Sequence, residues 1–94
     1  MIAYVIKHHA PGRIRIEIPE LKKMDMPELQ RLARVITPRW KIVGIRDISA
    51  RPLTGCMTIT YDPAVLDIAV YLAEMAADEE INALIEKGVT HEMQ

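Results

Sequence analysis

Residues 11–19 read Pro11-Gly12-Arg13-Ile14-Arg15-Ile16-Glu17-Ile18-Pro19, an alternation of charged and apolar side chains with a break at each end. Successive side chains of a strand point to opposite faces, so a period of two is typical of a half-buried strand. Pro and Gly at the ends confine that strand to residues 13–18. We therefore expect its isoleucines in the core and its charged side chains on the outer face.

A second stretch repeats the pattern and reads Pro52-Leu53-Thr54-Gly55-Cys56-Met57-Thr58-Ile59-Thr60-Tyr61-Asp62-Pro63. Thr54-Gly55 predicts a hairpin turn, because Gly tolerates the positive φ that a tight turn requires. The strand that follows is expected to bury Met57, Ile59 and Tyr61 and to expose Cys56, Thr58 and Thr60. The strand before the turn is expected to bury Ile48 and Ala50, with Ile45 in the preceding turn.

Two further stretches predict helices. The first begins after Asp25 as N-cap, with Pro27 at its favoured first position and Pro38 at its end. Its buried stripe is expected to consist of Leu29, Leu32, Ala33 and Ile36. The second is expected to begin at Asp62-Pro63 and is apolar nearly all round as far as residue 76. Residues 81–87 predict one more helical segment, closed by Gly88.

The order strand, helix, strand, strand, helix predicts an α+β fold of the ferredoxin-like, split β-α-β type. Its antiparallel sheet would carry the helices on one face. Residues 1–88 are expected to form a single domain. Val89–Met93 are expected to form a short edge strand or a tail, so that a fourth strand is short or absent.

Composition limits the classes of function. The chain has 94 residues, of which 50% are hydrophobic, and a formal net charge of −1, so charge alone suggests neither nucleic acid nor an anionic membrane as partner. The outer sheet face carries no aromatic side chains for stacking on RNA bases. A single cysteine, and the lack of a signal peptide or an apolar stretch that could span a bilayer, predict a cytoplasmic protein without membrane insertion.

Four short motifs carry a family resemblance. They are Pro11-Gly12-Arg13-Ile14-Arg15, Gly44-Ile45-Arg46-Asp47-Ile48, Arg51-Pro52-Leu53-Thr54-Gly55-Cys56 and Tyr61-Asp62-Pro63. Through these four motifs, the chain resembles a divergent branch of the heavy-metal-associated domain family, a branch that lacks the Cys-x-x-Cys metal motif. Arg51 and Cys56 stand where that branch usually has Asn and Ser. The resemblance implies an accessory role in the handling of transition metals such as iron, and it does not imply catalysis. No cofactor is expected.

His8, His9 and Cys56 are the candidate metal ligands, because imidazole and thiolate together suit Zn or Fe. Adjacent histidines in an extended chain point to opposite sides, so only one of them could join the cysteine. The alternative is that these histidines are solvated side chains near a strand end. Met24 and Met26 occupy the loop where relatives carry the metal-binding cysteines, but thioethers are weaker ligands than thiolates.

Two surfaces are candidates for protein contacts. On the outer sheet face Arg13, Arg15 and Arg51, with the turn Thr54-Gly55, could bind an anionic or protein partner; a plain solvated face is the alternative. On the second helix, Ile68, Tyr71 and Met75 are expected to face outward as an apolar stripe that supports a homo-oligomer. The alternative there is that residues 81–87 fold back and cover the stripe.

The sequence favours a non-catalytic adaptor that contacts a second copy of itself or a metal-transport protein. A direct metal carrier that uses His8, His9 or Cys56 is the second hypothesis. A small enzyme is the third, and it is disfavoured because no nucleophile stands beside an evident base.

Overall fold

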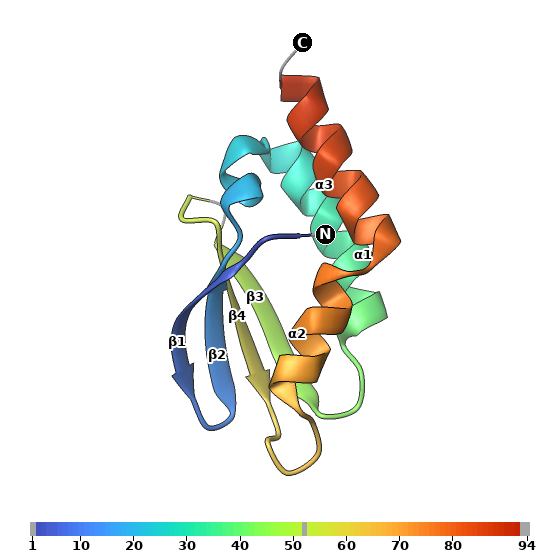
Figure 1. Cartoon of the computed structure of the whole chain (residues 1–94). Coiled ribbons are helices and arrows are strands. Elements are labelled where there is room, and N and C mark those ends of the chain that lie inside the picture. The colour runs from blue at the N-terminus through green and yellow to red at the C-terminus, as the bar shows by residue number, and fades with distance from the viewer. Residues whose placement is uncertain (1, 52, 93–94) are drawn as a thin grey trace.

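A single antiparallel sheet carries all the α-helices on one of its faces (Figure 1). The computed structural model describes residues 2–51 and 53–92, with side chains as far as residue 86. Its elements are β1 (Val5–Ala10), β2 (Arg13–Glu17), the 3-10 helix η1 (Pro19–Lys23), α1 (Met26–Trp40), β3 (Ile45–Arg51), β4 (Cys56–Tyr61), α2 (Ile68–Ala76) and α3 (Glu79–Glu92). The predicted α+β class, with the helices on one face, is confirmed.

The prediction of a short or absent fourth strand is wrong, because the N-terminus supplies it as the six-residue β1. The strand order is β1-β2-β4-β3, and β1 pairs antiparallel with β2 through the turn at Pro11-Gly12. The predicted edge strand at Val89–Met93 is wrong, because residues 89–92 continue α3 through Gly88; Met93 lies outside the described residues. The edge beside β2 is occupied by β1, so the C-terminal segment has no strand to pair with there.

The face of the sheet toward the helices forms the core. Ile14, Ile16, Met57, Ile59 and Tyr61 are all buried, as the alternation predicted. Leu32 and Ile36 of α1, Leu72 and Met75 of α2, and Ile81 and Ile85 of α3 pack in the same cluster. Arg13 and Arg15 are exposed, and Cys56, Thr58 and Thr60 alternate with the buried residues of β4 on the outer face.

Strand β3 departs from the expected burial. Ile45 begins the strand and is buried, and the register shifts between Ile45 and Asp47. This irregularity explains why Ile45 and Ile48 face the same side although they are three residues apart. Ile48 is half-buried and Ala50 is exposed, so the predicted burial of Ala50 is wrong. The reason is that β3 is an edge strand, whose inner face the helices do not cover fully.

One boundary each of α1 and α2 also differs from the prediction. Asp25 caps α1 as expected, accepting a hydrogen bond from the Glu28 N–H at 3.0 Å, but α1 continues past Pro38 to Trp40. The helix α2 begins at Ile68, not at Pro63, and its N-cap is Asp67. Asp62 instead holds a turn, since its carbonyl accepts the N–H groups of residues 65 and 66.

Candidate functional site

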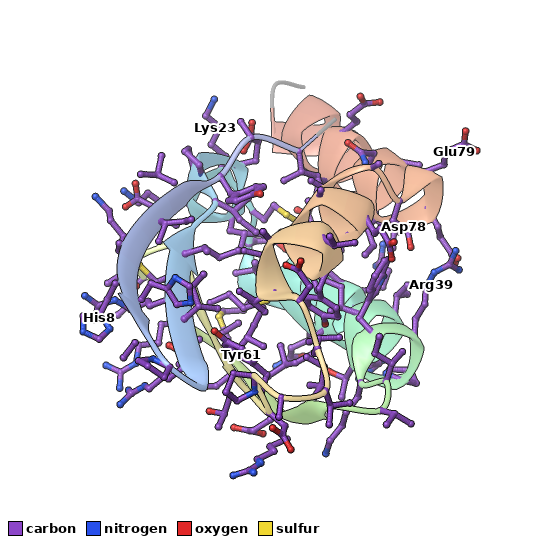
Figure 2. All side chains as sticks on the ribbon, turned by 60° about the horizontal axis from the view of Figure 1, so that its bottom comes forward. His8, Lys23, Arg39, Tyr61, Asp78 and Glu79 are labelled. Carbon is purple, nitrogen blue, oxygen red and sulfur yellow. The ribbon has the colours of Figure 1, made fainter. Side chains whose placement is uncertain are left out.

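The two histidines lie on opposite faces of β1, as expected. His8 is aligned with Arg15 on the outer face, whereas His9 is aligned with the buried Ile14. The Nε2 atom of His9 lies 2.8 Å from the Tyr61 hydroxyl and forms a hydrogen bond with it at the end of the core. Figure 2 shows His8 on the sheet side of the molecule, away from the helices.

Cys56 does not share a site with either histidine. Cys56 on β4 pairs with Glu17 of β2, and β1 lies on the far side of β2. His8 is aligned with Arg15 and Thr58, so it also lies two residues away from Cys56 along the strand direction. From strand spacing and rise, the Cα atoms of His8 and Cys56 are roughly 12 Å apart, and strand side chains stand nearly perpendicular to the sheet. Within the described part of the chain, no group of three or more His, Cys, Asp and Glu side chains converges as metal ligands would.

The methionines of the loop before α1 are separated as well. Met24 is buried in the core, at 7% exposure, whereas Met26 is 54% exposed. Lys22 forms an ion pair with Glu17 at 3.2 Å. The loop therefore presents no pair of adjacent thioethers to an ion.

The outer face of the sheet collects the arginines of the central strand β2. One row runs through His8, Arg15, Thr58 and Ser49, and the next runs through Ala10, Arg13, Thr60 and Asp47. Arg13 and Arg15 are exposed, and no ion pair joins either of them to another described residue. Glu17 on the same face is neutralised by Lys22. The guanidinium groups of Arg13 and Arg15, beside the threonine hydroxyls of β4, can each bind a carboxylate in bidentate fashion.

The turn at Thr54-Gly55 lies at one end of this face and adopts the predicted conformation. Gly55 has φ 69°, and its N–H donates to the Arg51 carbonyl at 3.0 Å. The backbone of Gly55 also passes close to the end of β2, where its carbonyl accepts the Ile18 N–H at 2.8 Å. The turn therefore joins β3, β4 and the end of β2.

The apolar stripe predicted on α2 is buried, and the prediction that it faces outward is wrong. Ile68, Tyr71 and Met75 are 8%, 2% and 4% exposed. The alternative fits better, because α3 packs beside α2 and its Ile81 is 1% exposed in the same core cluster. The Tyr71 hydroxyl donates to the Trp40 carbonyl at 2.8 Å, and burial raises the pKa of Tyr71. A homo-oligomer through this stripe therefore lacks its contact surface.

A polar cluster at the junction of α1 and α3 escaped the sequence analysis. One Asp78 carboxylate oxygen accepts hydrogen bonds from Arg39 Nε at 2.7 Å and Trp40 Nε1 at 3.0 Å. The other oxygen accepts the N–H groups of Glu80 and Ile81 and so caps α3. Burial by itself raises the pKa of Asp78, but the hydrogen bonds and the Arg39 charge outweigh it and lower that pKa. Figure 2 shows Arg39 and Asp78 side by side on the helix side.

The cluster around Asp78 is structural rather than catalytic in its geometry. Its carboxylate is saturated by four donors, which leaves no free lone pair aimed at a cleft. The sequence did contain one signal, an acidic residue before Glu79-Glu80 that suits a helix N-cap. Nothing in the local pattern indicated that Arg39 and Trp40, about forty positions earlier, would meet it.

A cavity of about 190 Å³ lies between the sheet and the helices. Its walls are almost entirely apolar and come from the inner sheet face, α1, α2 and α3. Exposed residues of α1 and β3, among them Ala33 and Ala50, line it as well, so it opens at the edge of the sheet. Such a cavity suits an apolar group, since it offers few polar partners.

Comparison of the chain with protein-family models, with curated proteins and with solved structures finds no match. No helix among the described residues has both the length and the apolar character needed to cross a membrane.

Proposed function

We propose that this chain is a non-catalytic adaptor domain that binds a partner protein through the outer face of its sheet. The observation that carries the proposal is the position of Arg13 and Arg15. Both are exposed on the central strand β2, the helices lie on the opposite face, and neither arginine is neutralised by another described residue. Acidic groups of a partner would supply the missing counter-charges.

The resemblance in the four motifs supports a setting in the handling of transition metals such as iron, in the cytoplasm. The partner would then be a metal-transport or metal-storage protein. A direct metal carrier is the weaker reading, because His8, His9 and Cys56 do not converge and His9 is hydrogen-bonded to Tyr61. Arg51, Thr54 and Gly55 would form the end of the docking face beside the β3–β4 turn.

A ferredoxin-like ancestry of the sheet is part of the proposal. The run β2-α1-β3-β4-α2 has the order of elements of the split β-α-β unit, and β2 lies beside β4. The edge position that a C-terminal strand would take in that fold is filled here by β1. Replacement of one edge strand by another leaves the two central strands and the outer face unchanged.

Charge reversal on the outer face tests the function. The probe is the set of cytosolic domains of a metal-transporting P-type ATPase from the same organism, with binding measured by biolayer interferometry. We expect the double variant Arg13→Glu/Arg15→Glu to bind at least tenfold more weakly than the wild type. The matched control is Lys23→Glu/Arg31→Glu, which makes the same change in net charge at exposed positions off this face.

The two parts of the proposal fail separately. Equal binding by the wild type and the Arg13→Glu/Arg15→Glu variant would show that the outer face is not the docking surface. Absence of binding to every transporter domain, with all variants folded by circular dichroism, would remove the metal-transport setting.

A further inference from the structure

The cavity opens along a line of α1 side chains that faces the edge of the sheet. Met26, Gln30, Ala33 and Thr37 are all exposed and all line the cavity. Their spacings of four, three and four residues place them in one row along the helix. Across the opening lie Ile48 and Ala50 of β3, so the opening is a groove between a helix and a strand.

The strand that borders this groove is an edge strand. β3 pairs with β4 on one side, and the order β1-β2-β4-β3 places no described strand on its other side. Its register shift is confined to the start, between Ile45 and Asp47, and the pairing is regular from there to Arg51. The main-chain N–H and C=O groups that point away from β4 are therefore arranged to pair with another strand.

The other edge of the sheet lacks this combination. The register of β1 shifts between Ile6 and His8, in the middle of the strand, which interrupts a regular pairing edge. Among the residues of β1, none lines the cavity. Among the described residues, only the β3 edge therefore combines unpaired main-chain hydrogen-bonding groups with the adjacent apolar cavity.

The charges beside the groove are mainly positive. Arg34 follows Gln30 by four residues and precedes Thr37 by three, which places it beside both mouth residues on α1. Arg46 and Arg51 are exposed on β3, where Asp47 is the one acidic residue. None of the three arginines forms an ion pair with a described residue. A ligand that complements the groove thus carries negative charge.

We propose that β3 and α1 form a groove for an extended acidic peptide of a partner protein, which adds to β3 as a new strand. Main-chain hydrogen bonds to β3 would supply affinity, as in other β-augmentation sites. One large apolar side chain would enter the cavity, whose 190 Å³ suits a group of leucine size. Acidic residues of the peptide would lie near Arg34 and Arg51. This groove does not use Arg13 or Arg15, and Arg51 is the one residue that it shares with the outer-face proposal.

The probe for this site is a blocked heptapeptide that alternates glutamate with leucine, titrated into the full chain and followed by NMR of backbone amides. We expect shift changes concentrated on residues 47–51 of β3 and on the exposed row of α1. A peptide with the same side chains, N-methylated at alternate residues to prevent pairing, should bind at least tenfold more weakly. Shifts centred on β1 or on the outer sheet face, or no shifts at millimolar peptide, would overturn the proposal.

Two variants locate the site. Ala33→Trp fills the mouth from an exposed position, and we expect it to reduce affinity at least tenfold without loss of the folded NMR spectrum. Arg34→Glu/Arg51→Glu should reverse the preference from the glutamate peptide to an alternating lysine–leucine peptide. Arg13→Glu/Arg15→Glu, which makes the same change in net charge on the outer face, is the matched control and should leave peptide binding within twofold. Decanoate is titrated in parallel, and an acyl chain that enters the cavity while the peptide fails to bind would refute the peptide assignment.

Discussion

The two sides of α1 are packed in opposite ways. Toward α3, the end of the helix is fixed by directed polar contacts, in which Asp78 binds both Arg39 and Trp40. Toward β3, the exposed row that includes Ala33 leaves the cavity open. The same helix is thus anchored by polar contacts on one side and borders an apolar space on the other. The groove can therefore stay open, because the position of α1 does not depend on contacts across it.

Removal of the anchor should have the largest effect on stability. Asp78→Ala removes the N-cap of α3 and leaves the Trp40 N–H without its partner, so we expect a loss of about 3 kcal/mol in the free energy of unfolding. Urea denaturation measures it. The matched control is Glu80→Ala, which removes only an exposed ion pair with Arg39 and should cost less than about 1 kcal/mol. Equal losses for both variants would show that Asp78 is not the anchor.

The anchor should also respond to acid. In the folded state, hydrogen bonds and the Arg39 charge hold the pKa of Asp78 below the ordinary aspartate value of 3.8, so its stabilising effect is complete above that value. The effect is lost as the pH falls through the lower pKa of the folded state. The stability difference between the wild type and Asp78→Asn should thus be constant from pH 7 to about 5 and shrink below pH 3.8. Urea midpoints across this range measure it, and a constant difference down to pH 2 would contradict it.

Substitutions in the β3–β4 turn test whether the far end of β3 is fixed as firmly as α1 is. Gly55→Val should cost about 1–3 kcal/mol, because φ is 69° and the new Cβ would lie 3.1 Å from the Ile18 carbonyl oxygen. Thr54→Ala is the control, since it loses only an exposed hydroxyl contact with the Arg51 carbonyl, and it should be nearly neutral. Denaturant midpoints in the opposite order would show that the turn tolerates a side chain.

The two faces of a strictly alternating strand were predictable from sequence, whereas the orientation of helix α2 was not. In β4 each side chain points to one of the two faces of the sheet, so polarity alone assigned Met57 to the core and Thr58 to the outer face. In α2 almost every position is apolar, and polarity could not tell which side meets the sheet and which meets α3. Tyr71 was therefore assigned to the wrong side. Periodicity carries information only where polar residues mark the exposed face.

The parts of the candidate sites that escaped prediction depend on contacts between distant segments. The N-terminal edge strand was not predicted as part of the sheet, because nothing local shows that β1 pairs with β2. The cluster of Asp78 with Arg39 and Trp40 joins residues nearly forty positions apart. The arginines of β2 were placed correctly, because alternation alone puts Arg13 and Arg15 on the outer face. The groove was missed because its mouth residue Ala33 was counted among the buried positions of the helix.

The smallest change in the free energy of unfolding is expected for a substitution on the open side of α1. The sign of that change distinguishes the open side from a packed position. Ala33→Leu adds apolar atoms from an exposed position at the mouth of an apolar cavity, so we expect a gain of up to about 1 kcal/mol. The same change at Ala76, which is 5% exposed in the packed core, should instead destabilise by about 1–3 kcal/mol through overpacking. Thermal and urea unfolding of both variants measure the contrast. A loss of stability in Ala33→Leu would mean that the groove closes in solution, and that the space beside β3 is not held open by the Asp78 anchor.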